Sequence, residues 1–178
     1  MASRTPSIPE GLDLITTPQQ VIIRRRWFSW MVFPMLLFAI VWDGFLVFWY
    51  STALLGKNTP WIMILFPIGH VAVGVGVTYY VLCSFFNRTD VILTPDQIAV
   101  ATRPLPWPGN RRVPLREIHE TEIRTRYGNT NQARANLVIM FVDGSNKERK
   151  LVTGITEWDH AEYMEGQIRR AVRLPEKA

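Results

Sequence analysis

The chain has 178 residues and a net charge of +5, from 20 lysines and arginines against 15 acidic residues. Its single cysteine, Cys83, excludes an internal disulfide and a cysteine-based zinc cluster. From residue 86 onward fifteen basic residues face twelve acidic ones, which is too even for a nucleic-acid-binding domain, and no nucleic-acid partner is expected. Hydrophobic residues make up 48%, but they gather in residues 27–86, where almost no charge falls. The composition indicates one membrane anchor and one modest domain.

After a polar N-terminal arm, residues 1–26, the chain enters two long apolar runs at residues 28–50 and 61–86. Each run exceeds the ~20 residues that a helix needs to cross ~30 Å of hydrocarbon. The first run is too long for the apolar part of a signal peptide. The sequence therefore predicts a transmembrane helical hairpin in the lipid bilayer, with possible kinks at Pro34 and Pro67.

The arginines predict the orientation of this hairpin. Three of them, at residues 24–26, directly precede the first run, and several more follow the second, whereas the loop between the runs holds only Lys57. Basic residues are retained on the cytoplasmic side of a membrane. We therefore expect a two-pass protein with both termini in the cytoplasm and the short loop outside.

Two ionisable residues lie within the apolar runs, Asp43 in the first and His70 in the second. Counted from Tyr50 and from Trp61, at ~1.5 Å per residue, both would lie ~10–14 Å below the outer boundary. Antiparallel helices would then place them side by side, as a hydrogen-bonded pair that locks the hairpin. The alternatives are a proton relay, or His70 as an axial ligand of haem or a chlorophyll-type pigment; otherwise no cofactor is expected.

Small residues in the second run indicate a close helix contact. Gly69, Ala72 and Gly76 share one helical face, and Gly74 lies one turn after His70. Such a face serves equally for packing against the first helix or against a partner protein.

Residues 87–174, followed by a tail at 175–178, have the pattern of a β domain. Apolar stretches with strand periodicity alternate with turn residues, and the proline-rich segment 103–110 cannot lie inside a sheet. Residues 128–134 are expected to form a polar loop, and Asp143 with Gly144 predicts a hairpin turn. About six antiparallel strands are expected, at residues 89–94, 98–102, from 113, 118–127, 137–142 and 147–152.

The last expected element is an amphipathic helix at residues 157–173. Thr156 is placed to cap it, with Asp159 completing a capping box. Its apolar side chains recur at helical spacing. They are Trp158, Ala161, Met164, Ile168 and Val172. This helix would seal one end of an open barrel or sandwich, which gives an α+β fold.

Several of these segments together resemble a known family. They are the two apolar runs, the junction FNRTDVILT at residues 86–94, the loop PLPWPGN at residues 104–110 and the terminal helix. The combination resembles bacterial membrane proteins with a pleckstrin-homology-like domain, of which photosynthetic complex assembly proteins are one relative. The resemblance covers residues 27–174. It implies a PH-like β domain on the cytoplasmic side of the bacterial inner membrane, without enzyme activity.

The proline-rich loop carries basic residues on both sides of Trp107. Arg103, Arg111 and Arg112 are placed to lie with Trp107 on anionic headgroups or on a partner. The alternative is that Trp107 packs against its own domain.

No catalytic motif and no metal-ligand motif appears in the sequence. The neighbours His119-Glu120 and Asp159-His160 lie in a predicted strand and helix, where adjacent side chains point apart, so all four are expected at the surface.

The function that these features predict is a non-enzymatic, membrane-anchored scaffold or accessory subunit. It would bind another integral membrane protein, a photosynthetic complex being one specific version. The alternatives are a module that binds anionic lipid surfaces, and a transporter or cofactor-binding subunit that uses Asp43 and His70.

Overall fold

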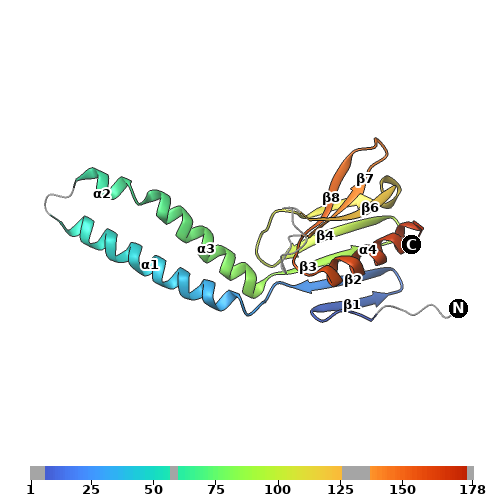
Figure 1. Ribbon diagram of the computed structural model, residues 1–178, viewed down its shortest axis with the longest axis horizontal. Helices are drawn as coiled ribbons and strands as arrows, with labels where there is room; N and C mark the ends of the chain where they lie inside the picture. The colour runs from blue at the N-terminus through green and yellow to red at the C-terminus, as the bar shows by residue number, and fades with distance from the viewer. Residues whose placement is uncertain (1–6, 57–59, 126–136, 176–178) are drawn as a thin grey trace. The chain divides into compact units, whose positions relative to one another are not determined.

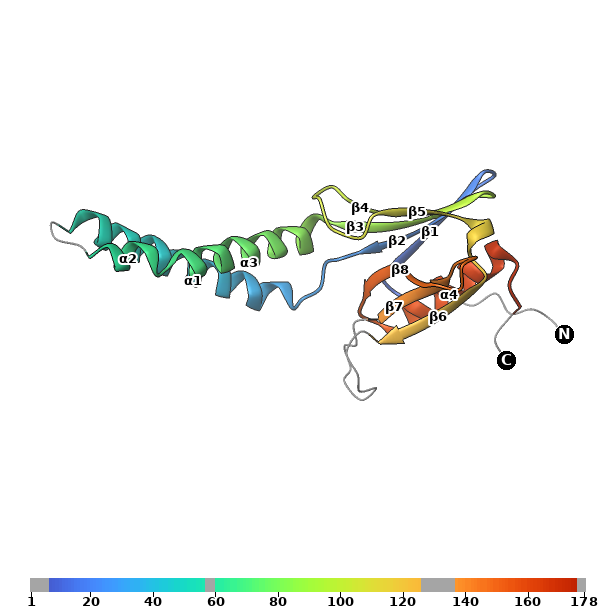
Figure 2. The same ribbon diagram turned by 90° about the horizontal axis from the view of Figure 1, so that it is seen from above.

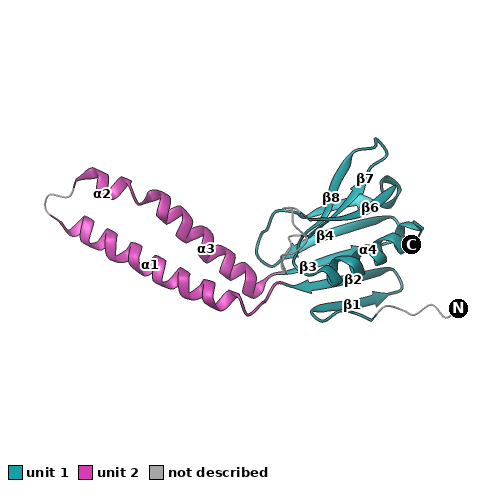
Figure 3. Ribbon diagram, in the orientation of Figure 1, with its two compact units in different colours: residues 1–26, 88–178 teal, residues 27–87 magenta. Residues whose placement is uncertain are grey.

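The structure, a computed structural model, describes residues 7–56, 60–125 and 137–175. The chain divides into two compact units (Figure 3): a helical hairpin, Trp27–Asn87, and a β unit made from Met1–Arg26 and Arg88–Ala178. Two apolar helices, antiparallel sheets and a C-terminal helix are present, so the α+β class is confirmed. The sheets do not close into a barrel.

The hairpin consists of α1 (Val32–Leu55), a short α2 (Trp61–Leu65) and α3 (Ile68–Phe86) (Figure 1). The spans Val32–Leu55 and Trp61–Phe86 are long and apolar enough to cross a membrane. Only 17% and 11% of their most apolar windows are buried, whereas a helix in the core of a soluble protein would be mostly covered.

The second span breaks between α2 and α3, at Pro67, because proline has no backbone N–H to donate. The break frees the carbonyls four residues before Pro67 and Ile68, and α1 supplies donors for both. The Trp49 Nε1–H donates to the Met63 carbonyl at 3.0 Å, and the Tyr50 hydroxyl donates to the Ile64 carbonyl at 3.1 Å. A helix break in an apolar environment requires such replacement donors.

The β unit contains two antiparallel sheets. The first has five strands in chain order: β1 (Leu12–Thr17), β2 (Gln20–Arg26), β3 (Arg88–Leu93), β4 (Gln97–Arg103) and β5 (Arg111–Pro114). After a 3₁₀ turn, Leu115–Glu117, the second has β6 (Glu120–Thr125), β7 (Leu137–Val142) and β8 (Glu148–Ile155). The chain then enters α4 (Trp158–Val172). The loop expected at residues 128–134 lies outside the described residues.

The expected N-terminal arm is instead largely part of the first sheet. Residues 12–26 form β1 and β2, and β2 pairs with β3 from Val21↔Leu93 to Arg26↔Arg88. The segment has the alternation of a strand, with Ile23 fully buried. Its strand partner β3 is separated from it along the chain by the whole hairpin. The hairpin is therefore inserted between two neighbouring strands of one sheet.

The core of the β unit lies where the two sheets and α4 meet. Figure 2 shows the five-stranded sheet on one side and the three-stranded sheet with α4 on the other. Fully buried apolar side chains come from all three components. They are Ile23, Val91, Ile98, Ile139, Leu151, Ile155, Ala161, Met164 and Ile168.

The start of α4 differs from the expectation. Glu157 occupies the N-cap position with extended backbone, and no side chain caps the helix, so the Thr156–Asp159 capping box does not form. Trp158 is 52% exposed, because the burying contacts of α4 begin after it, at His160 and Ala161. Of the rest of the predicted face, Ala161, Met164 and Ile168 are buried and Val172 is half-buried.

Candidate functional site

Only a narrow strip of the α1 surface is buried in the contact between α1 and α3. One residue in seven is buried along α1: Val32, Ala39, Leu46 and Ala53. A seven-residue repeat keeps one edge of a helix against its neighbour. The remaining side chains of α1 leave a groove beside this contact.

This groove has a volume of about 660 Å³ and is lined by one face of α1 and one face of α3. Its walls are mostly aliphatic, and its polar side chains come from both helices. The lining residues are Asp43, Leu46, Val47, Tyr50, Ser51, Leu54, Val71, Val75, Thr78, Tyr79 and Leu82. Each helix lines the groove over about three turns, which is long enough for a third helix to pack along it.

Asp43 lies in this groove and is hydrogen-bonded to Thr78. The Thr78 hydroxyl donates to Asp43 Oδ2 at 2.7 Å. The other carboxylate oxygen lies over Gly74, where a Cβ would approach Oδ1 to 2.5 Å and the ring of Trp42 to 3.2 Å. Gly74 is therefore the glycine that permits close approach of the helices, because any side chain there would displace the carboxylate.

The predicted Asp43–His70 pair does not form, because Asp43 lies over Gly74 and bonds to Thr78, which come one and two turns after His70 along α3. The Trp42 Nε1–H, next to Asp43, donates to the His70 carbonyl at 3.1 Å. The His70 ring lies between aromatic rings, with its centroid 5.7 Å from that of Trp42 and 5.4 Å from that of Phe66. Asp43 therefore contacts the turns of α3 that follow His70, and the His70 ring packs among aromatic side chains instead.

The small residues Gly69, Ala72 and Gly76 do not pack against α1. All three are exposed, and a Cβ added at either glycine would meet no atom within 4 Å. Of the two predicted uses of this face, the packing within the hairpin is absent, and the contact with a partner stays a prediction.

Of the residues predicted to contact a membrane or a partner at the loop between β4 and β5, Arg111 is engaged within the β unit. Arg111 turns toward the second sheet, donating to the carbonyl oxygens of Lys150 and, at 3.2 Å, of Gly109. Trp107 is half-buried, whereas Arg103 and Arg112 are exposed. The backbone N–H of Thr102 in β4 donates to Asn110 Oδ1 at 2.7 Å, and this hydrogen bond holds the end of the loop against β4.

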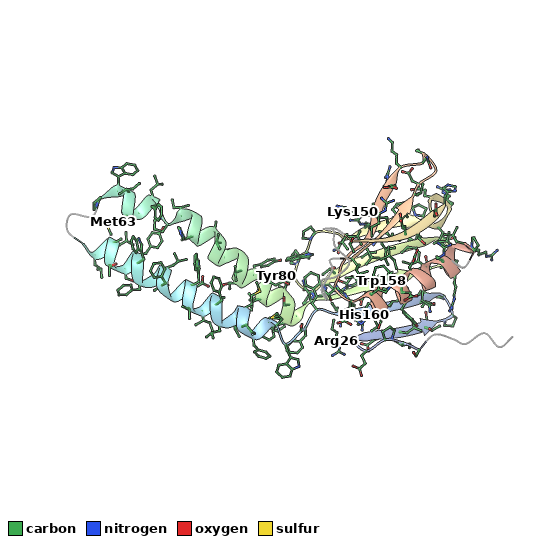
Figure 4. The ribbon with its side chains drawn as sticks, in the orientation of Figure 1. Arg26, Met63, Tyr80, Lys150, Trp158 and His160 are labelled. Carbon is green, nitrogen blue, oxygen red and sulfur yellow. The ribbon has the colours of Figure 1, made fainter. Side chains whose placement is uncertain are left out.

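Strand register brings together other arginines that the sequence pattern did not group. Arg26, labelled in Figure 4 at the end of β2, lies opposite Arg88, and Arg88 lies opposite Arg103. One step further along the same strands, Arg24 Nε donates to Asp90 Oδ1 at 2.8 Å. This hydrogen bond raises the pKa of Arg24 above its ordinary value.

His160 was expected at the surface but is buried, at 5% exposed. Its Nε2 lies 2.7 Å from the carbonyl oxygen of Glu10 and 3.1 Å from Glu157 Oε2. Gly11, at φ +83°, lies against the imidazole ring. The segment before β1 occupies the space over α4 that was expected to be open to solvent, and His160 (Figure 4) fixes that segment to the helix.

Within the described residues, no group of three histidine, cysteine or acidic side chains is placed to hold a metal ion. The sequence matches no model of a known protein family, and no curated protein is significantly similar to it. The features of the molecule that bear on function are the groove of the hairpin and the surfaces of the β unit.

Proposed function

We propose that the chain is a two-pass membrane protein that acts as a non-enzymatic scaffold or accessory subunit for another integral membrane protein. The apolar, exposed spans support membrane insertion. The β2–β3 pairing supports an even number of crossings, because both ends of the hairpin must reach one sheet in one compartment. The arginines near both ends support the cytoplasm as that compartment.

The observation that carries the proposal is Asp43 in the open groove. Across residues 27–56 and 60–87 the hairpin holds no lysine or arginine to pair with this carboxylate, and the ring of its histidine, His70, packs between Trp42 and Phe66 instead. Thr78 supplies one hydrogen bond, and a carboxylate accepts several. Acidic residues within a bilayer commonly pair with a basic residue of a neighbouring helix.

The occupant that fits the groove is a transmembrane helix of a different protein, carrying a lysine or arginine at the depth of Asp43. A second copy of this chain does not offer this charge, since its own described spans contain no lysine or arginine.

We propose a PH-like fold for the β unit, supported by two antiparallel sheets and a C-terminal helix packed in their core. The resemblance adds a photosynthetic complex as one candidate partner. Absorbance of the purified assembly tests that version, because such a partner would bring its pigment.

Cross-linking in the native membrane tests the groove. A photoreactive residue at Val47 or Val75, both in the groove, should capture an apolar helix of another protein that contains lysine or arginine. The same probe at Ile40, which is 61% exposed but outside the groove, is the matched control. Asp43→Leu should abolish the groove adduct, and Ser51→Ala, also in the groove, should not.

Adducts with lipid alone, or with a second copy of this chain, would overturn the proposal. So would an adduct whose yield is the same in the Asp43→Leu variant, because the carboxylate would then not select the partner.

A further inference from the structure

A row of three arginines, which we call the arginine row, crosses three neighbouring strands of the β unit. It consists of Arg26 on β2, Arg88 on β3 and Arg103 on β4, and each is the direct cross-strand partner of the next. Directly opposed residues of antiparallel strands project from the same face, with their Cβ atoms ~4.5–5.5 Å apart. Segments far apart in the sequence therefore present three guanidinium groups side by side.

The arginine row lies on the outer face of the sheet. Each member is three residues from a core residue on its own strand, and side chains alternate between faces along a strand. Those core residues are Ile23, Val91 and Val100. All three arginines are exposed, and the Arg26 side chain keeps 76% of its accessible surface.

Acidic side chains do not neutralise the arginine row. Asp13 approaches only Arg26, with Oδ2 3.7 Å from Nε, and both side chains are more than half exposed, so the pair is weak. The nearby Asp90 is already held by Arg24. The other two members of the row form no ion pair with any residue that the structure describes. Like charges opposed across a sheet repel, and an anion bound between them removes that repulsion.

The chain itself places the arginine row next to the membrane boundary. Arg26 directly precedes Trp27, and Arg88 is the second residue after Phe86, the end of α3. The adjoining end of the hairpin is a cluster of aromatic rings, with centroids 5.4–6.2 Å apart. The cluster contains Phe28, Trp30, Phe33 and Phe85. Such rings prefer the headgroup level of a bilayer. Because consecutive Cα atoms are only ~3.8 Å apart, the arginines that adjoin the hairpin in the chain lie close to that level.

We infer that the arginine row binds the phosphate groups of anionic phospholipid headgroups. Guanidinium groups donate paired hydrogen bonds to phosphate oxygens, and a row of them matches adjacent headgroups. A basic residue beside an anionic leaflet strengthens binding by roughly fivefold. The inference rests on insertion of the hairpin and not on a partner in the groove, so it stands or fails separately from the scaffold proposal.

Lipid binding by the full chain in neutral-detergent micelles tests the inference. Native mass spectrometry follows the titration with short-chain phosphatidylglycerol or phosphatidylcholine. The wild type should retain phosphatidylglycerol preferentially. Replacing all three members, Arg26→Gln with Arg88→Gln and Arg103→Gln, should weaken phosphatidylglycerol binding by roughly 100-fold and leave phosphatidylcholine unaffected.

The matched control removes three positive charges elsewhere, by Arg116→Gln, Lys147→Gln and Lys150→Gln, all of them exposed. It should bind phosphatidylglycerol like the wild type. Replacing the row with lysines, by Arg26→Lys with Arg88→Lys and Arg103→Lys, should recover most of the affinity for phosphatidylglycerol. An unchanged far-UV circular dichroism spectrum shows that a variant is folded.

Equal losses in the row variant and the control variant would overturn the inference, because net charge alone would then explain binding. Unchanged binding in the row variant would overturn it as well. A titration with soluble glycerol phosphate distinguishes a lipid headgroup from a free phosphate ester as the ligand. Row-dependent binding of glycerol phosphate as tight as that of the lipid would overturn a lipid headgroup as the ligand; much weaker binding supports it.

Discussion

At the residue scale, Asp43 shows how the hairpin manages a carboxylate within its apolar spans. One oxygen accepts from Thr78, and Gly74 leaves room for the other. Counting residues from the ends of two antiparallel helices predicted Asp43 opposite His70, but Asp43 lies opposite Gly74, one turn further along α3. The offset between two packed helices depends on where their side chains interlock, and no count of residues supplies that offset.

A double-mutant cycle distinguishes the pair that forms from the pair that was expected. Asp43→Asn and Thr78→Val should each destabilise the hairpin, with a coupling of about 0.6–1.7 kcal/mol. Asp43→Asn and His70→Ala should be additive, because no hydrogen bond joins them. Unfolding of the full chain in detergent measures both cycles. Coupling confined to the His70 cycle would contradict the geometry.

Acid should destabilise the β unit through Asp143 and Glu148. The backbone N–H groups of Lys147 and Ser145, with Arg149, lower the pKa of Asp143 below its ordinary 3.8, and hydrogen bonds from Arg124 lower the pKa of Glu148 below 4.5. Both groups are more acidic in the folded state, so their stabilisation is complete above about pH 5 and is lost as the pH falls through the lowered values.

The melting temperature, followed by far-UV circular dichroism between pH 7 and pH 3, checks this expectation. Asp143→Asn should melt lower than the wild type at pH 7 and approach it at pH 3. Parallel curves at every pH would show that this carboxylate does not couple folding to protonation.

At the scale of elements, α4 joins the two sheets through one face. Ile168 is fully buried there, whereas Trp158, in the same helix, is 52% exposed. Ile168→Ala should cost about 2–5 kcal/mol, as for other buried aliphatic truncations. Trp158→Ala should change stability by less than about 0.5 kcal/mol, although it removes the larger side chain. Denaturant unfolding measures both, and equal effects would contradict the assigned face.

The long apolar helices, most strands and α4 could be predicted, because each carries a periodic signal in a continuous stretch of sequence. The strand β2 could not be recognised from residues 20–26 alone, since three arginines end it and its partner β3 follows only after the hairpin. The arginine row depends on the same long-range pairing. The break at Pro67 was expected, but the donors Trp49 and Tyr50 that satisfy it depend on the helix contact.

At the scale of the whole molecule, the sheet constrains the topology. Because β2 pairs with β3, the segments before and after the hairpin must lie in the same compartment. We expect alkaline phosphatase fused after Gly56 to be active, and the enzyme fused after Ala178 to be inactive, since it folds only outside the cytoplasm. Reporter assays in cells measure both fusions. Activity of the second fusion without the first would reverse the orientation.

The insertion of the hairpin between β2 and β3 also sets the order of events during synthesis. The ribosome releases β1 and β2 first, and the whole hairpin, residues 27–87, follows before β3 exists to cover the open edge of β2. An exposed edge strand invites pairing with the wrong chain. The two ends of the hairpin meet where the Trp27 N–H donates to the Asn87 carbonyl at 3.2 Å. We therefore expect the hairpin to form before β2 and β3 pair, which leaves the edge of β2 open until the two helices have come together.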